Sequence, residues 1–256
     1  MSETPPPGAP LLETRGLSKR FGGVHALEGV DFRLRAGEVV ALAGDNGAGK
    51  STFTKLISGV FAPSGGEILV GGETVAFDGP QAARRRGIET IYQDLALADN
   101  LDVGGNLFLG RELMTRTLGL PRVDRRRMRE EAAKALAVLD VRLDRPERPV
   151  RALSGGQRQA VAIGRAIYWD ARIIIMDEPT AALGVPEQRK VMELVRSLRD
   201  RGLGVIFISH NLADMFAVSD RIVVLRRGRL AGERAADETE PEEIVRLMVG
   251  RDEGAR

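Results

Sequence analysis

The chain has 256 residues, enough for one large domain or two small ones with a sizeable core. Hydrophobic residues make up 43% and charged residues 29%, and a net charge of +2 is too small to predict a nucleic-acid partner. The absence of cysteine excludes disulfides and thiolate metal sites, and two histidines exclude a histidine-rich metal cluster.

The first ten residues contain four prolines and no hydrophobic core, so we interpret residues 1–10 as a flexible lead and not a signal peptide. No apolar run approaches the ~20 residues that span a bilayer. A role at a membrane would therefore need a partner that supplies the membrane part. We expect one domain over residues 11–250 and a tail at 251–256.

Alternating apolar residues predict strands over 24–34, 39–43, 67–70 and 87–92, and a helix that begins within 49–59. The strand pattern is then lost. Helical spacing of Ala133, Leu136 and Ala137 predicts a helix over residues 129–140, in an α-helical subdomain inserted at about 95–165. The arginine run at 125–127 is interpreted as a solvated helix start.

After Leu153 strands and helices alternate again. Strands are predicted over 173–176, 205–209 and 222–225, and a helix over 186–201 with Pro186 in its first turn and Gly202 at its end. This alternation predicts an α/β fold with a mostly parallel sheet covered on both faces.

A phosphate-binding loop is the strongest motif. It has two glycines five residues apart followed by Lys and Ser, and it lies between the strand at 39–43 and a helix. Backbone amides of such a loop surround phosphate oxygens, Lys50 reaches the terminal phosphates, and Ser51 offers a hydroxyl to Mg²⁺. The predicted nucleotide-binding residues are Gly44, Asp45, Asn46, Gly47, Ala48, Gly49, Lys50, Ser51 and Thr52.

Two adjacent carboxylates, Asp177 and Glu178, follow the apolar strand at 173–176. Ligands of α/β proteins bind at the carboxyl ends of parallel strands. We expect Asp177 to hold Mg²⁺, through water, and Glu178 to orient and deprotonate an attacking water. The alternative is an ordinary strand end that turns into the loop at Pro179.

A pentapeptide begins a helix 20 residues before the carboxylate pair. It consists of Leu153, Ser154, Gly155, Gly156 and Gln157. Ser154 can cap a helix and the glycines expose backbone N–H groups, which makes the segment a second anion site. With the phosphate loop and the carboxylates, this order of motifs resembles the ATP-binding cassette (ABC) ATPases over about residues 11–250. The resemblance implies a phosphate-loop ATPase core with a mixed, mostly parallel sheet, an N-terminal antiparallel β subdomain and an inserted α-helical subdomain.

The resemblance implies roles that the residues alone leave open. Family members place the signature pentapeptide on the γ-phosphate of a partner chain, so that two ATP molecules lie between two cassettes. Gln93 resembles the glutamine that contacts Mg²⁺ and the attacking water; by itself it could be a solvated loop residue. His210 resembles the histidine that bonds the γ-phosphate, although a lone histidine at a strand end is often structural. Phe21 resembles the aromatic residue that stacks on adenine, with a core phenylalanine as the alternative.

Two positions depart from the family pattern. The adenine-stacking residue is commonly Tyr, and Phe21 lacks only the hydroxyl, so stacking is expected to survive. Gly184 stands where the family usually has Asp, a residue that helps the two sites of the dimer communicate. The departure puts tight coupling between the sites in doubt, but not nucleotide binding.

Residues 92–110, 180–185 and 208–227 resemble the simple-sugar (fructose- and ribose-type) importers of the ABC class. This implies an ATP-hydrolysing, Mg²⁺-dependent subunit that forms a homodimer at the cytoplasmic face of the inner membrane. Its expected partners are transmembrane permease subunits and, indirectly, a solute-binding protein, with no nucleic acid. The alternatives are another transporter, a cassette protein that acts on the ribosome or DNA, an unrelated phosphate-loop kinase or GTPase, and a nucleotide sensor without turnover.

Overall fold

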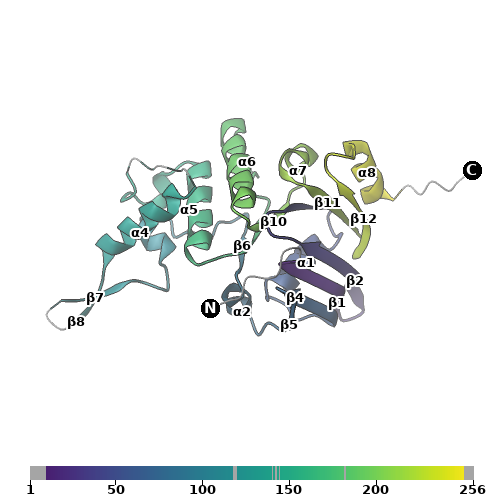
Figure 1. The fold of residues 1–256 in the computed structure, drawn as a ribbon, viewed down its shortest axis with the longest axis horizontal. Coiled ribbons are helices and arrows are strands. Elements are labelled where there is room, and N and C mark those ends of the chain that lie inside the picture. The colour runs from purple at the N-terminus through teal and green to yellow at the C-terminus, as the bar shows by residue number, and fades with distance from the viewer. Residues whose placement is uncertain are drawn as a thin grey trace, which may run out of the picture. The chain divides into compact units, whose positions relative to one another are not determined.

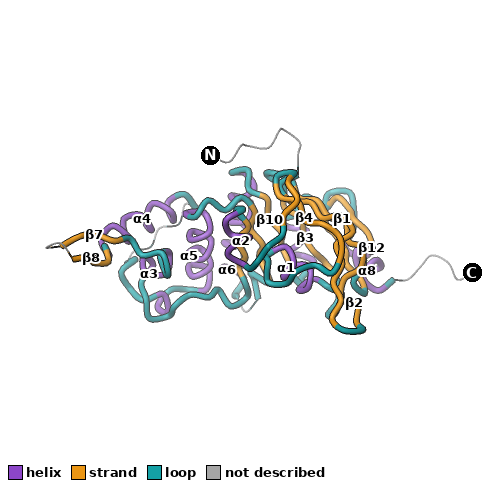
Figure 2. The backbone as a smooth tube through the Cα atoms, turned by 90° about the horizontal axis from the view of Figure 1, so that it is seen from below, coloured by secondary structure: helices purple, strands orange, loops and turns teal. Residues whose placement is uncertain are grey.

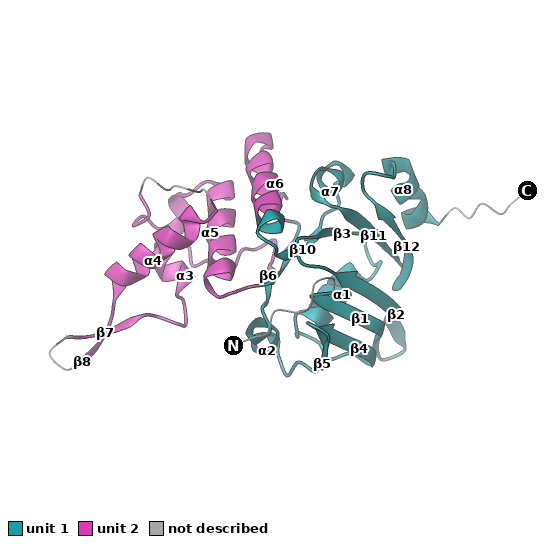
Figure 3. Ribbon diagram, in the orientation of Figure 1, with its two compact units in different colours: residues 1–90, 172–178, 198–256 teal, residues 91–171, 179–197 magenta. Residues whose placement is uncertain are grey.

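The computed structural model describes residues 10–117, 120–139, 141, 143, 145–181 and 183–250. Most of the expected lead and all of the expected tail lie outside this part. The chain divides into two compact units, which Figure 3 distinguishes by colour. Unit 1 comprises residues 1–90, 172–178 and 198–256, and unit 2 comprises 91–171 and 179–197. The helical subdomain expected at about 95–165 falls within the residue range of unit 2, and its boundaries stay a prediction.

A six-stranded sheet forms the centre of unit 1 (Figure 1). Its strand order is β12 (Arg229–Ala235), β11 (Arg221–Arg226), β3 (Val39–Ala43), β10 (Gly204–Ile208), β9 (Ile173–Asp177) and β6 (Ile88–Ile91). The four strands β11, β3, β10 and β9 run parallel, and β12 pairs antiparallel with β11. The expected mostly parallel sheet is confirmed.

An antiparallel sheet is the second layer of unit 1, as the fold class predicts. Its order is β2 (Val24–Leu34), β1 (Leu12–Phe21), β4 (Gly65–Val70) and β5 (Glu73–Val75). The β1–β2 register shifts between Thr14 and Leu17. At this bulge Gly16 has φ 56°, and its N–H donates to Asp31 Oδ1 at 2.7 Å.

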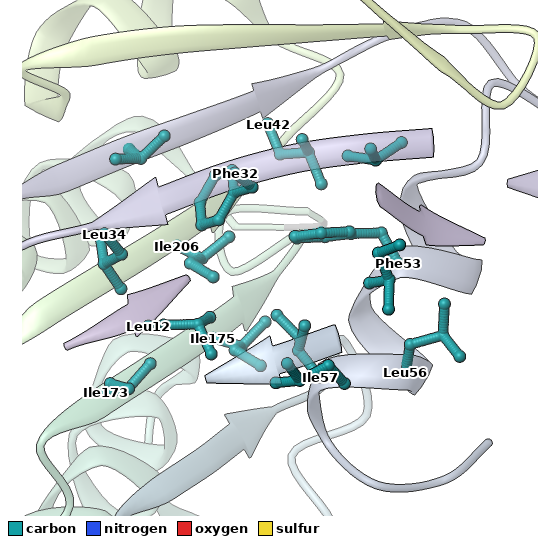
Figure 4. Packing of buried hydrophobic residues seen from close by; sticks show 14 of the residues in the cluster. Leu12, Phe32, Leu34, Leu42, Phe53, Leu56, Ile57, Ile173, Ile175 and Ile206 are labelled. Atoms are coloured by element: carbon teal, nitrogen blue, oxygen red, sulfur yellow. The ribbon is translucent and has the colours of Figure 1, made fainter. Parts of the chain in front are cut away.

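The core of unit 1 lies between these two layers and α1 (Lys50–Ile57) (Figure 4). Every residue of β3 and β10 is buried, which is why both read as continuous apolar runs. Phe53 of α1 packs edge-on against Phe32 of β2, with 5.1 Å between ring centroids. Because Phe53 is fully buried, Phe53→Ala would cost about 3–5 kcal/mol.

Unit 1 also contains α2 (Pro80–Arg85) between β5 and β6, α7 (Leu212–Val218) between β10 and β11, and α8 (Pro241–Val249) after β12. Pro241 begins α8 and Gly250 ends it in the left-handed conformation, the usual placement of these two residues. None of the described helices is both long and apolar enough to cross a membrane.

Unit 2 is mainly helical. It contains α3 (Val103–Leu107), α4 (Arg125–Ala137), the 3₁₀ turn Val150–Ala152, α5 (Gly155–Tyr168) and most of α6 (Val185–Asp200). The helix expected from Arg129 starts four residues earlier, because Asp124 caps it by accepting the N–H of Arg127 at 3.0 Å. The buried Asn106 bonds the backbone of Ala98, Leu101 and Asp102 and fixes the loop before α3.

A hairpin in unit 2 corrects the prediction that this stretch lacks strands. Strand β7 (Met114–Thr117) pairs with β8 (Leu120–Val123) and with no other described strand. The strands have four residues each, and Pro121 and the arginines weaken any alternating pattern. Figure 2 shows the hairpin extending beyond the helices of the same unit.

Candidate functional site

The loop between β3 and α1 contains three glycines with positive φ, and two of them have no room for a side chain. Gly44, Gly47 and Gly49 have φ values of 149°, 81° and 108°. A Cβ on Gly44 would collide with the Leu225 carbonyl, and one on Gly49 would lie 3.0 Å from the Ala26 carbonyl. The loop therefore keeps its backbone N–H groups free of side-chain cover, which suits it to bind phosphate.

Lys50 is the first residue of α1 and is half-buried. Its Nζ donates to the carbonyl of Gly44 and, at 3.2 Å, to that of Asp45. Burial lowers the pKa of Lys50, and the nearby Glu178, Asp45 and Asp177 partly offset this effect. The ammonium is thus desolvated and held by its own loop, and phosphate oxygens would supply better partners than neutral carbonyls.

The two carboxylates stand where β9 ends. Asp177 pairs in register with Ile208 of β10, and Ile208 pairs with Leu42 of β3. The ends of three neighbouring parallel strands are therefore level and bring Asp177 beside the phosphate loop. Burial raises the pKa of Asp177, and the adjacent Glu178 raises it further, while Lys50 and Lys55 lower it.

Glu178 has a left-handed backbone, φ 52°, which is uncommon for a residue with a Cβ. Its N–H donates to the Ile208 carbonyl at 2.9 Å. Its Oε2 lies 2.7 Å from Nδ1 of His210, which follows β10 after Ser209. The carboxylate and the imidazole could together hold a water and take its proton.

Phe21 ends β1 and is 44% exposed. Its ring contacts Phe61 edge-to-face, with centroids 5.2 Å apart, and the Lys19 ammonium lies 5.2 Å from its centre. The exposed ring offers a face to a planar ligand, and the core alternative does not fit its exposure. The sequence did not point to Phe61, whose only signal is an aromatic residue four positions after α1.

Gly228, in the turn between β11 and β12, also contacts the phosphate loop, and no sequence motif predicted this role. Its N–H donates to the Ala48 carbonyl at 2.9 Å, and its φ is 77°. A Cβ at Gly228 would lie 2.9 Å from the Ala26 carbonyl. A turn far along the chain thus fixes the loop, and glycine is needed there.

The predicted site residues Gln93 and 153–157 belong to unit 2. Gln93 is exposed in the loop after β6. Ser154 and Gln157 form a capping box at the start of α5: the Gln157 N–H donates to Ser154 Oγ at 3.3 Å, and the Ser154 N–H to Gln157 Oε1 at 3.0 Å. A Cβ on Gly155 would collide with Leu183, whereas Gly156 has room.

The oxygen donors of unit 1 fit a magnesium ion bound together with phosphate. The described residues hold no group of three His, Cys, Asp or Glu that could bind a metal by themselves. Ser51 and Asp177 offer one hydroxyl and one carboxylate, and a hard cation would need phosphate oxygens and water for the rest. Burial and the adjacent Glu178 raise the pKa of Asp177 despite Lys50 and Lys55, and a bound cation would offset both effects.

Comparisons with known proteins agree on one family. The family profile described as ABC transporter matches residues 27–181. The chain is 49% identical over 93% of its length to the xylose/arabinose import ATP-binding protein XylG of Sulfolobus acidocaldarius, and covers 93% of that protein. It is 47% identical over 86% of its length to the fructose import ATP-binding protein FrcA of Rhizobium meliloti, of which it covers 86%.

The chain spans about half the length of the ribose import relatives it matches. RbsA 2 of Rubrobacter xylanophilus is 49% identical over 94% of this chain, which covers 46% of that protein. Among solved structures, an ATP-binding cassette of an ABC transporter in its ADP conformation superposes with a TM-score of 0.80 at 25% identity, covering 95% of this chain and all of the other. A dimeric cassette in a post-hydrolysis state, bound to ADP and Pi, gives a TM-score of 0.71 at 25% identity and covers 88% of this chain and 98% of that one.

Proposed function

The chain belongs to the ABC transporter family and is an ATPase of that class, and from this premise we propose that it is the energy-coupling subunit of a simple-sugar importer. The observation that carries the proposal is the level ending of β3, β10 and β9, which gathers Lys50, Asp177, Glu178 and His210 at one sheet edge. The choice of a sugar importer is supported by the names of the relatives, which import xylose or arabinose, ribose and fructose.

In the proposed site, residues 44–52 enclose the phosphates and Phe21 stacks on the adenine. When ATP binds, the Lys50 ammonium exchanges its hydrogen bonds to the two loop carbonyls for hydrogen bonds to the β- and γ-phosphates. Ser51, Asp177 and Gln93 would hold Mg²⁺, which supplies charge neutralisation to the phosphate oxygens when bound. Glu178 orients a water in line with the γ-phosphorus and accepts its proton. The water oxygen bonds to that phosphorus as the bond to the bridging β-phosphate oxygen breaks, which yields ADP and inorganic phosphate.

We propose a homodimer in which Leu153, Ser154, Gly155, Gly156 and Gln157 of each chain contact the γ-phosphate bound by the other. The exposed Ser154 and the N–H groups at the start of α5 present partial positive charge to an anion. The γ-phosphate then joins the two chains, and hydrolysis releases them. A solved dimeric relative bound to ADP and Pi supports this arrangement.

The proposed partners are transmembrane permease subunits, with a solute-binding protein acting through them, and the proposed place is the cytoplasmic face of the inner membrane. A cassette protein that acts on the ribosome or DNA is the competing function. The net charge of +2 and the importer relatives favour transport.

Reconstitution tests the proposal. The chain, its permease and its binding protein are placed in proteoliposomes, and ATP hydrolysis is measured with xylose, arabinose, ribose and fructose in turn. We expect one sugar to stimulate hydrolysis and to accumulate inside, and Lys50→Ala to abolish both. Hydrolysis that responds to ribosomes or DNA and to no sugar would favour the competing function.

A further inference from the structure

The β7–β8 hairpin of unit 2 is exposed along its whole described length. Met114, Leu120 and Val123 are 54%, 71% and 38% exposed, and no described strand pairs with either edge. Isolated two-stranded hairpins are marginally stable in water. A surface of this kind, projecting from its unit in Figures 1 and 2, calls for a partner that covers it.

The charge of this region indicates what that partner is. Residues 111–129 contain seven arginines against Glu112 and Asp124. Both acids are occupied by backbone amides: Glu112 accepts from Gly110 at 3.1 Å and Asp124 from Arg127 at 3.0 Å. The excess positive charge therefore faces solvent, where it would attract an anionic partner.

Four of these arginines have no carboxylate partner in the described part of the chain: Arg116, Arg122, Arg125 and Arg127. The others are engaged, Arg126 with Glu130 at 2.9 Å, Arg129 with Asp102 at 2.8 Å and Arg111 over the Trp169 ring at 4.5 Å. Arg125 and Arg127 stand in the first turn of α4, where cations oppose the helix dipole, and Asp124 at the N-cap is the one acidic residue set against the three arginines of that turn. An anion bound there would relieve this unfavourable placement.

The order of residues along the hairpin fits a lipid surface. Leu120 pairs with Thr117, and Arg116 opposite Pro121 and Arg122 opposite Thr115 come next. Met114 opposite Val123 forms a second apolar pair, and the α4 arginines follow it in the chain. An apolar end with arginines behind it matches the sequence of acyl chains and phosphate headgroups across a membrane interface. We propose that Met114, Arg116, Leu120, Arg122, Val123, Arg125 and Arg127, here called the arginine hairpin, dock the protein on anionic phospholipid.

Co-sedimentation of the full chain with vesicles tests this proposal. Wild type should bind phosphatidylcholine vesicles that contain phosphatidylglycerol, bind pure phosphatidylcholine vesicles far less, and be released by about 0.5 M salt. The variant Arg116→Gln/Arg122→Gln/Arg125→Gln/Arg127→Gln should bind on the order of several hundredfold more weakly, and Leu120→Ser should weaken binding without changing its salt dependence.

The matched control removes the same charge elsewhere: Arg84→Gln/Arg85→Gln/Arg86→Gln/Arg246→Gln, all on exposed side chains of unit 1, should bind like wild type. Circular dichroism and ATP hydrolysis in solution should be unchanged in the hairpin variants, which separates this proposal from the proposed function. Equal binding to neutral vesicles, no binding by wild type, or an equal loss in the control variant would overturn it.

Discussion

Glu178 and His210 are hydrogen bonded through Oε2 and Nδ1 at 2.7 Å, although 32 residues separate them in the chain. The glutamate is 20% exposed and the histidine 78%. A neutral imidazole that donates its Nδ1 proton to the carboxylate has only an acceptor left at Nε2. His210 can therefore donate to a phosphate only after it leaves Glu178 or gains a second proton. If it leaves, the contact of His210 with the γ-phosphate frees the Glu178 carboxylate to act as the base.

Replacing Glu178 should separate binding from hydrolysis. Glu178→Gln keeps the size and the contact with His210 but cannot accept a proton, so we expect ATP hydrolysis to fall at least ~100-fold with ATP affinity retained. Size-exclusion chromatography with MgATP should show a trapped dimer. Glu193→Gln, on the exposed face of α6, is the control and should hydrolyse normally. Turnover near wild type in Glu178→Gln would remove this residue from the role of base.

The two histidines of the chain form a natural pair for a second test. His210→Ala should lower ATP turnover roughly 10- to 100-fold, because Glu178 loses its partner and the γ-phosphate loses a donor. Stability should hardly change, since the imidazole is mostly exposed. His25→Ala, also exposed, should leave turnover intact. Equal effects of both substitutions would show that His210 has no special role.

The charge of Asp177 should make the nucleotide-free protein less stable than the Asp177→Asn variant. Its carboxylate is half-buried beside Glu178, which is why its pKa is raised, so Asp177→Asn should raise Tm by about 2–4 °C without nucleotide. This figure allows for partial exposure. Magnesium-dependent hydrolysis should be lost at the same time. Differential scanning calorimetry and an ATPase assay measure both effects.

The pH dependence of that stability follows from the direction of the pKa shift. A carboxyl group whose pKa is raised in the folded protein contributes stability that is complete below its unfolded value of 3.8 and is lost as the pH rises through the folded value. The Tm advantage of Asp177→Asn should therefore grow between about pH 4 and about pH 7. An advantage that shrinks over this range would contradict the assigned cause.

Local sequence patterns predicted the parallel sheet and the phosphate loop because both arise from short-range rules. The apolar runs at 39–43 and 173–176 match β3 and β9 to within one residue. The Glu178–His210 bond depends on strand order, which a sequence pattern does not contain. The left-handed backbone of Glu178 and the support from Gly228 depend on contacts between distant segments. The β7–β8 hairpin was missed because four-residue strands with Pro121 carry almost no periodic signal.

Gly184 can be tested by restoring the usual Asp. It lies directly before α6, and its carbonyl accepts the first helical bond, from the Gln188 N–H at 2.9 Å. A Cβ there meets only the end of the Glu187 side chain, and Asp is a good cap, so Gly184→Asp should change stability by a few tenths of a kcal/mol. We expect a higher Hill coefficient for ATP hydrolysis. Gly184→Asn, an uncharged cap of the same size, should leave the coefficient unchanged.

Ser154 has two proposed roles that a pair of substitutions can separate. It caps α5 by accepting the Gln157 N–H at 3.3 Å, and it is exposed where a second chain would bring its γ-phosphate. Ser154→Asp keeps an acceptor for the cap and adds a negative charge, so folding should be retained while like charges oppose contact with the phosphate. ATP-dependent dimerisation of this variant should be abolished, even in the Glu178→Gln background.

Ser154→Asn is the matched comparison, because it caps a helix as well as Asp does and carries no charge. It should dimerise with MgATP more weakly than Ser154 but measurably, and Ser154→Ala should lose about 1 kcal/mol of stability with the cap. Analytical ultracentrifugation with and without MgATP, alongside thermal unfolding, distinguishes the two roles. If Ser154→Asp dimerises as well as Ser154→Asn, the start of α5 does not face a phosphate, and the two-chain nucleotide site is wrong.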